Sequence, residues 1–275
     1  MIKDIVVQLT GSAEDDVRLA YATEIARSFT AHLTGLQLHV LPEVLTTTDP
    51  GGFGFPQQLI AESEARADAV GEKLKQRLSG ADIVQELRRL DVLPGQVGSA
   101  LASEARTADL FVGTRPYGDP SGQSHIEEAV LFRSGRGCLF VPPLGTSPAR
   151  YATILVAWKN SRESARAVAE ALPFLQKAQS VVVAVMEEGQ ATEELKLEAG
   201  ADIGRYLSRH GVSAEIRKTS GWSDTGAAIL NEAKQIGADM IVMGGYGHSR
   251  FREWILGGVT RHVLSESPVP VLTAH

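Results

Sequence analysis

Cysteine is almost absent from this sequence: Cys138 is the only one among 275 residues. The chain therefore cannot form an intrachain disulfide. Cys138 lies in the strand-like run Cys138-Leu139-Phe140-Val141, which predicts a buried and unreactive thiol. No apolar run approaches the roughly 18 residues of a membrane-spanning helix, and the first residues lack the apolar core of a signal peptide. We therefore expect a cytoplasmic protein with no membrane partner.

An excess of basic residues is also missing. Lysine and arginine number 27 against 33 acidic residues, which gives a formal net charge of −6. A protein whose main partner is a nucleic-acid backbone needs a basic face, so we expect no nucleic-acid partner. The hydrophobic content of 43% with 22% charged residues is typical of a globular protein with a substantial core.

Several catalytic motifs are absent as well. The sequence contains no Gly-x-x-x-x-Gly-Lys-Ser/Thr loop, no Gly-x-Ser-x-Gly elbow and no His/Cys cluster with zinc spacing. These absences leave the P-loop, serine-hydrolase and zinc mechanisms without support. An enzyme would need a reactive residue that the sequence does not reveal.

What the sequence does contain is a pattern that occurs twice. Apolar runs of strand length alternate with helical segments, and equivalent points are marked by Ala108-Asp109-Leu110 and Ala238-Asp239-Met240. Five strands alternating with helices in each copy predict an α/β fold with right-handed crossovers and two doubly wound, mostly parallel five-stranded sheets. The third strand, around Ile83 to Leu90, carries charged residues that are typical of a sheet edge.

The boundary between the copies is a stiff segment rich in proline, Pro142 to Pro148. We therefore place the domains at residues 1–144 and 150–275. Each copy ends in an apolar strand next to a proline, Cys138 to Val141 and Val269 to Thr273. A lone terminal strand exposes unpaired backbone groups, so we expect the two strands to cover one another in an intramolecular pseudo-dimer. Further self-association into a homodimer remains open.

The second copy carries a glycine-rich stretch after its fourth strand. The apolar run Met240 to Met243 leads into Gly244-Gly245-Tyr246-Gly247, and Gly257-Gly258-Val259-Thr260 follows nine residues later. Glycines between a strand and a helix let backbone N–H groups form a concave anion site beside the helix amino terminus. Close packing against a neighbouring element is the alternative explanation.

This spacing resembles the universal stress protein family, whose ATP-binding members carry Gly-x-x-Gly, nine residues, then Gly-Ser or Gly-Thr. Gly244, Gly247 and Gly257 match, whereas Gly258 stands where the family usually has a hydroxyl residue. Thr260 could supply a hydroxyl instead. The resemblance covers the whole chain as two tandem copies and is closer in the second. It implies a Rossmann-like fold of the adenine-nucleotide alpha-hydrolase type.

The resemblance also implies a site for ATP, or for AMP or ADP, in the second copy, with Mg²⁺ accompanying the nucleotide. In the family the backbone near the ends of the second and fourth strands holds adenine, which points here to Val185 and Met243. The family often has an aspartate near the end of the first strand, where this chain has Lys159, either a phosphate contact or a solvated side chain. The candidate binding residues are Ala157, Lys159, Val185, Met243, Gly244, Gly247, His248, Gly257, Gly258, Val259 and Thr260.

The first copy departs from the motif. Its fourth strand is followed by Gly113-Thr114-Arg115-Pro116-Tyr117-Gly118, in which the glycine spacing is wrong and Pro116 removes an N–H donor. We expect that the first copy has lost the phosphate site. Arg115 leaves open the possibility that the first copy binds a different anion, although an exposed arginine is more often only solvated. Ser161 is expected to cap a helix, and Trp158 is expected to pack in the core.

These observations favour a tandem universal stress protein with one adenine-nucleotide site and a regulatory or stress-tolerance role. Any ATP hydrolysis would be slow, because the sequence shows no general base and no clear pair of metal ligands. The rival hypothesis is a scaffold that binds no nucleotide and acts through protein contacts. A third is an enzyme of the wider adenine-nucleotide α/β group.

Overall fold

The structure is a computed structural model of the chain. It describes residues 1–43, 54–80, 82–117, 124–145, 151–186, 193–219, 222–246 and 258–275. None of the helices in these ranges is long and apolar enough to cross a membrane.

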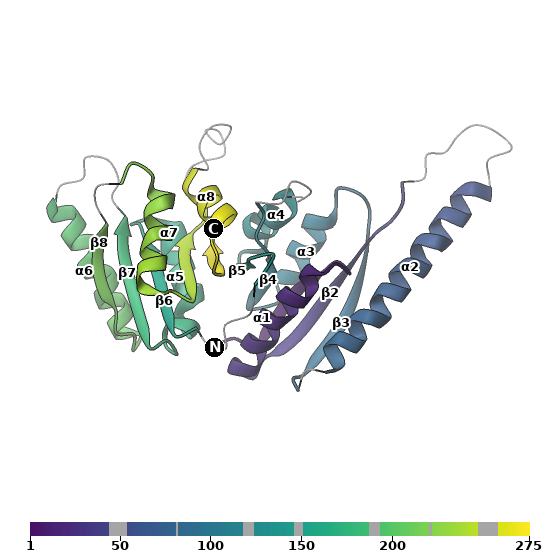
Figure 1. The fold of residues 1–275 in the computed structure, drawn as a ribbon, viewed down its shortest axis with the longest axis horizontal. Coiled ribbons are helices and arrows are strands. Elements are labelled where there is room, and N and C mark those ends of the chain that lie inside the picture. The colour runs from purple at the N-terminus through teal and green to yellow at the C-terminus, as the bar shows by residue number, and fades with distance from the viewer. Residues whose placement is uncertain are drawn as a thin grey trace.

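Ten strands form one sheet in the order β3-β2-β1-β4-β5-β10-β9-β6-β7-β8 (Figure 1). The first five strands belong to the first half of the chain and the other five to the second half, and each half has the same internal order, as the repeat predicts. The strands are β1 (Asp4–Leu9), β2 (His32–Val40), β3 (Gln85–Val92), β4 (Leu110–Thr114), β5 (Gly137–Val141), β6 (Thr153–Trp158), β7 (Ser180–Met186), β8 (Glu215–Thr219), β9 (Met240–Gly244) and β10 (Val271–Ala274).

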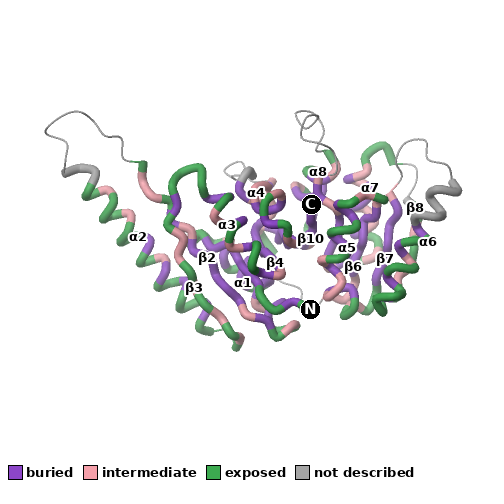
Figure 2. Tube along the Cα trace, turned by 180° about the vertical axis from the view of Figure 1, so that it is seen from behind, coloured by how far each residue is buried: buried purple, intermediate pink, exposed green. Residues whose placement is uncertain are grey.

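Helices cover both faces of this sheet. One hydrophobic core holds residues of α1, α2, α5 and α6, and the other holds residues of α3, α4, α7 and α8. The inner strands are therefore buried on both faces, which explains their continuous apolar runs (Figure 2). The helices are α1 (Glu14–Phe29), α2 (Gly54–Ser79), α3 (Val97–Ala105), α4 (Ser124–Ser134), α5 (Arg162–Leu175), α6 (Glu193–Arg209), α7 (Thr225–Ile236) and α8 (Gly258–Glu266).

The two halves meet where β5 and β10 pair antiparallel, while every other strand pairing described is parallel. Leu272 lies opposite Leu139, and Thr273 lies opposite Cys138. The predicted pairing of the two terminal strands is confirmed. Cys138 is fully buried, as predicted, and burial raises the pKa of its thiol to about 12, which disfavours the reactive thiolate.

The edges of the sheet are β3 and β8, and both carry charged residues. The predicted edge position of the third strand is therefore confirmed. The strand begins at Gln85, two residues after the predicted Ile83, because its pairing with β2 begins where Leu33 lies opposite Gln85. Charged side chains on an edge discourage pairing with another chain.

Two local expectations have different outcomes. Ser161 caps α5, since its side chain accepts a hydrogen bond from the Ser164 N–H at 3.3 Å. Arg115 is not simply solvated, because its guanidinium donates to the carbonyl oxygen of Ser267 at 2.8 Å and so connects the first half to the second. The proposed domain boundary falls between β5 and β6, and residues 146–148 of the predicted linker lie outside the described residues.

Candidate functional site

The candidate site of the second half lies at the carboxyl ends of three adjacent strands. In the order β8-β7-β6-β9-β10, the chain first adds strands on one side of β6 and then on the other, so the strand order reverses between β6 and β9. Ala157 of β6 lies opposite Met243 of β9, and Trp158 lies opposite Val185 of β7. The structure therefore brings Ala157, Val185 and Met243 together at the place where ligands bind in open α/β sheets.

Gly244 is the last residue of β9, and it packs against the start of α5. A Cβ atom at this position would lie 2.6 Å from the backbone nitrogen of Ser164 and 2.7 Å from the carbonyl carbon of Glu163. Both contacts are shorter than real Cβ atoms make, so this helix start can approach the strand end only if residue 244 is glycine. Close packing, the alternative explanation for the glycine pattern, holds at Gly244. The packing brings the amino terminus of α5 to the strand ends.

The Thr260 side chain forms a hydrogen bond to the glycine-rich stretch that follows β9. Its buried hydroxyl accepts a hydrogen bond from the Tyr246 N–H at 3.3 Å. Tyr246 has a φ of 52°, a left-handed conformation that a residue other than glycine adopts rarely. The Thr260 hydroxyl therefore helps to hold an unfavourable turn between β9 and α8.

Gly258 contrasts with Gly244. It is the first residue of α8, it is exposed, and an added Cβ would lie more than 4 Å from every atom of the described residues other than its own neighbours in the chain. Packing does not require a glycine at this position. Val259 is half-buried and packs against the core that α8 covers.

The remaining candidates are placed only in part. Gly247, His248 and Gly257 lie outside the described residues, so the anion site that they are expected to form remains a prediction. Lys159 follows β6 and is half-buried, and its carbonyl oxygen accepts a hydrogen bond from the Ser161 N–H at 2.7 Å.

Trp158 adds a feature that sequence reasoning missed. It packs in the core as predicted and is 8% exposed. Its indole N–H is buried and has no hydrogen-bond partner within the part of the chain that the structure describes. A buried unpaired donor is unusual in a folded protein, and this one belongs to the last residue of β6. The sequence signal was a tryptophan at the end of an otherwise aliphatic strand.

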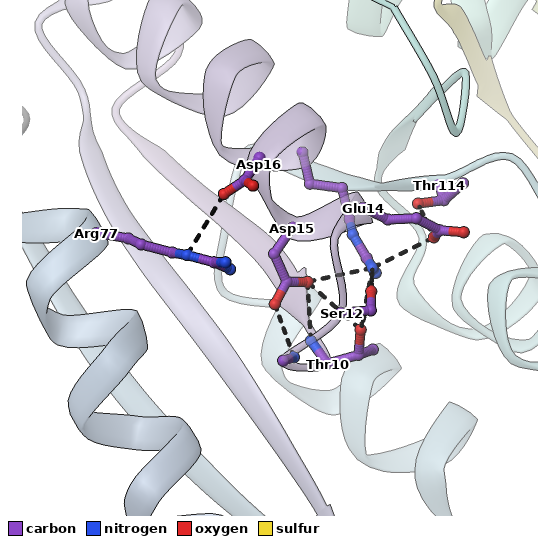
Figure 3. A network of polar contacts seen from close by, with 9 residues as sticks. Thr10, Ser12, Glu14, Asp15, Asp16, Arg77 and Thr114 are labelled. Carbon is purple, nitrogen blue, oxygen red and sulfur yellow. Dashed lines mark hydrogen bonds and ion pairs between the residues drawn. The ribbon is translucent and has the colours of Figure 1, made fainter.

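The corresponding end of the first half is closed by charged side chains (Figure 3). The Asp15 carboxylate accepts hydrogen bonds from the Thr10 N–H at 3.0 Å and the Gly11 N–H at 2.7 Å. Arg18, only 2% exposed, lies 3.2 Å from Asp15 and 3.4 Å from Glu14. The backbone donors of the turn after β1 are thus satisfied by the protein itself.

A second layer of contacts ties this network to β4 and α4. Thr114 donates to Glu14 at 3.0 Å over a sequence separation of 100 residues. Burial lowers the pKa of Arg18, although Asp15, Glu14 and Glu127 oppose that shift. Burial also raises the pKa of Glu127 to about 7 against the attraction of Arg18. Sequence reasoning missed the network, because Glu14 and Asp15 look like ordinary acidic residues in the first turn of a helix.

The turn after β9 contacts the first half directly. The hydroxyls of Tyr246 and Tyr117 share a hydrogen bond, and Tyr246 also donates to Glu128 at 3.2 Å. The Phe132 ring packs against Tyr246 with 5.1 Å between ring centroids. The first half therefore helps to position the residue that follows Gly245.

A metal centre finds no support in the described ranges, since no group of three or more His, Cys, Asp or Glu side chains is placed to hold an ion. A metal ion that accompanied a nucleotide would depend on the phosphates for most of its ligands.

Comparison with known proteins identifies one family. The family model described as the universal stress protein family matches residues 150–275. Universal stress protein Slr1230 of Synechocystis is 32% identical over 79 residues, which are 28% of this chain and 27% of that protein. The match thus spans only about a quarter of that relative's length.

Solved structures show the same fold over nearly the whole chain. The crystal structure of a universal stress protein from Archaeoglobus fulgidus has a TM-score of 0.75 at 20% identity, covering 98% of this chain and 95% of that one. A functionally unknown protein from Pseudomonas aeruginosa has a TM-score of 0.62 at 16% identity, covering 98% and 92%. At these identities the likeness concerns the fold alone.

Proposed function

The chain belongs to the universal stress protein family, and we propose that it binds ATP, or AMP or ADP, at the carboxyl ends of β6, β7 and β9. Membership of the family supports a role in the stress response. We propose further that the bound nucleotide serves a regulatory or stress-tolerance function and that one site exists per chain, in the second half.

One observation carries this proposal: Ala157, Val185 and Met243 lie at neighbouring strand ends where the strand order reverses. Ala157 and Met243 pack in one core and Val185 in the other, so a planar base at this point would meet the strand ends themselves. Such a base needs a flat contact and a few hydrogen bonds. The unpaired indole N–H of Trp158 at the end of β6 supplies a donor that a ligand atom could satisfy.

The phosphates are assigned to the residues between β9 and α8. Tyr246 donates a hydrogen bond to Thr260, so the described residues on either side of Gly247, His248 and Gly257 lie beside the start of α8. An anion at this place would meet the positive end of the helix. Gly258 leaves room there, and the position of Lys159 after β6 allows its ammonium to approach a phosphate.

Hydrolysis forms no part of the proposed role. The candidate residues include no carboxylate, and His248 is the only one whose side chain ordinarily accepts a proton near neutral pH. Mg²⁺ is proposed only as an ion that accompanies the nucleotide phosphates.

The rival function is a scaffold that binds no nucleotide. The contacts of Tyr246 with Tyr117 and Glu128 favour it, because they give the turn after β9 a structural role independent of any ligand. The two functions differ in one measurable property, the amount of nucleotide bound per chain.

The test is calorimetric titration of the intact chain with ATP, together with native mass spectrometry of protein purified without added nucleotide. We expect one ATP per chain. Gly258→Glu places a negative charge in open space beside the proposed phosphates, and we expect it to weaken ATP binding at least tenfold, about 1.4 kcal/mol. Gln96→Glu adds the same charge at the exposed start of α3 in the first half and should leave binding unchanged.

Three results would contradict the proposal in different ways. Absence of ATP binding would favour the scaffold. Two equivalent sites per chain would show that the first half is not closed. Equal effects of the two substitutions would place the nucleotide away from α8.

A further inference from the structure

A cavity lies at the opposite end of the sheet from the candidate nucleotide site. It has a volume of about 440 Å³ and lies between the carboxyl end of α1, the residues that precede β6 and the carboxyl end of α5. Its walls therefore come from both halves of the chain. Small-molecule sites typically range from about 300 to 1,000 Å³ and occur preferentially at domain interfaces, so both the size and the place of this cavity suit a ligand.

Three aromatic rings give the cavity its apolar walls. Phe174 is buried, and the rings of Phe29 and Tyr151 meet it edge to face, with centroids 5.2 and 5.4 Å away and interplanar angles of 80° and 83°. Edge-to-face contacts fix the orientation of rings, because the positive edge of one faces the negative face of the other. The cavity thus has aromatic walls that are already oriented.

The polar group of interest in the cavity is the Tyr151 hydroxyl. It is buried and has no hydrogen-bond partner among the residues that the structure places. A buried hydroxyl without a hydrogen bond is destabilising, because it has lost its bonds to water and gained none in return. Burial also raises the pKa of this hydroxyl, so the group keeps its proton and can donate to an acceptor on a ligand.

The charged side chains of the cavity favour an anion. Among the lining side chains Arg27 and Lys177 are positive and Glu24 is negative, a net charge of +1. The Asp239 carboxylate, which is not part of the lining, also acts on Tyr151. Glu24 is already paired with Arg27 at 2.9 Å. The Lys177 ammonium lies 4.3 Å from the centroid of the Phe29 ring and donates to the Ser28 carbonyl oxygen, which holds a positive charge beside the aromatic walls.

We propose that this cavity binds a small aromatic carboxylate. The ring of the ligand lies among Phe29, Tyr151 and Phe174, and its carboxylate accepts hydrogen bonds from Lys177 and the Tyr151 hydroxyl. A cationic aromatic ligand would gain from the rings but would be repelled by Lys177. A neutral aromatic ligand would form no ion pair with Lys177. The proposal does not depend on nucleotide binding, because no candidate nucleotide residue lines the cavity.

The experiment measures binding of benzoate and phenylacetate to the full-length chain by calorimetry and by ligand-observed NMR. Benzylamine and benzyl alcohol are the charge-reversed and neutral controls. We expect at least one of the two carboxylates to bind at least tenfold more tightly than either control. Lys177→Met keeps an apolar stem and should weaken carboxylate binding at least tenfold, and Tyr151→Phe should weaken it three- to tenfold.

Lys75→Met is the matched control, since Lys75 is an exposed lysine of α2, paired with Glu72 and absent from the cavity lining. Thermal unfolding of each variant establishes that it is folded before titration. The proposal is overturned if neither carboxylate binds saturably up to about 10 mM, if benzylamine binds as tightly, or if Lys177→Met and Lys75→Met have the same effect.

Discussion

The two halves use the same strand order but treat the carboxyl end of their sheets in opposite ways. Strands β1 and β6 have equal length and their bounds differ by 149 residues, so Asp15 corresponds to Ser164 and Arg18 to Ala167. Thr114, the last residue of β4, corresponds to Gly244, the last residue of β9. These three side chains of the first half are thus replaced by small ones in the second, whereas the charge of Glu14 is retained in Glu163.

The difference concerns the backbone donors of the turn after the first strand of each half. In the first half, the backbone donors after β1 are bonded to Asp15, and Arg18 neutralises that carboxylate. In the second half, the Ser161 hydroxyl caps α5, and the buried Glu163 carboxylate, the counterpart of Glu14, pairs with Arg162. An internal carboxylate in the first half satisfies the donors of this turn, where a ligand could otherwise bind. The following variants test that interpretation.

The largest effect is expected from Arg18→Met. This substitution removes the buried partner of Asp15 and leaves a carboxylate that is 0% exposed, so we expect the free energy of unfolding to fall by about 3–5 kcal/mol. Arg27→Met, in the same helix, breaks the Glu24 pair at the exposed Arg27 and should change it by less than about 1 kcal/mol. Chemical denaturation of both variants measures the contrast. Similar losses for the two would mean that the Arg18 network is not a buried ion pair.

The next comparison uses two glycines of the second half. Gly244→Ala forces a Cβ to within 2.6 Å of the backbone of α5, and such overpacking should destabilise the protein by about 1–3 kcal/mol. Gly258→Ala adds a Cβ in open space and should change stability by less than about 0.5 kcal/mol. Melting temperatures and denaturation midpoints distinguish them. If Gly244→Ala is as stable as Gly258→Ala, the start of α5 does not require a glycine at the end of β9.

A smaller and pH-dependent effect is expected at Glu127. Burial raises its pKa in the folded protein to about 7, against the attraction of Arg18, with Glu14 and Glu128 adding to the rise. The folded state therefore binds a proton more tightly than the unfolded state, whose glutamate pKa is near 4.5. The resulting stability is fully present below about pH 4.5 and is lost as the pH rises through about 7.

Glu127→Gln removes this titration. The stability of the unmodified protein relative to the variant should fall by about 1–2 kcal/mol between pH 4.5 and pH 7, a range set below the full shift because Glu127 is only partly buried. Urea denaturation at a series of pH values measures the difference. A constant or rising difference over that range would contradict the raised pKa.

The smallest effect concerns ATP affinity and rests on the proposed function. Gly258→Ser restores a hydroxyl at a position where a side chain meets no other atom, and one additional hydrogen bond to phosphate should tighten ATP binding about two- to fivefold. Gly258→Ala lacks the hydroxyl and is the control for loss of glycine. Calorimetric titration compares the three proteins. Weaker binding by the serine variant than by the alanine variant would place the phosphates elsewhere.

Most of the fold could be predicted from the sequence. The bounds of β6 are those expected, the charged third strand is an edge, and the terminal strands β5 and β10 pair. A continuous apolar run of strand length indicates a strand that is buried on both faces of a sheet. Because the pattern occurs twice, each strand or helix could be predicted from two stretches of sequence. The grouping of Ala157, Val185 and Met243 likewise followed from their places at strand ends.

The closed end of the first half could not be predicted. Its bonds join Thr114 to Glu14 across 100 residues, and nothing local in the sequence distinguishes a buried Asp15 or Arg18 from a solvated one. The role of Arg115 was also missed, because its acceptor is the Ser267 carbonyl of the other half. Long-range polar contacts depend on how the elements pack, and the hydrophobic pattern carries little information about them.

The antiparallel pairing of β5 with β10 has a consequence for how firmly the two halves stay together. Because both strands belong to one chain, each experiences the other at an effective concentration on the order of millimolar, whatever the concentration of the protein in the cell. Dilution cannot separate them. The association of two identical subunits responds to the amount of protein present, whereas this joint does not. The two halves can therefore differ in sequence while their association stays the same, as the buried Asp15–Arg18 pair of the first half and its small counterparts in the second illustrate.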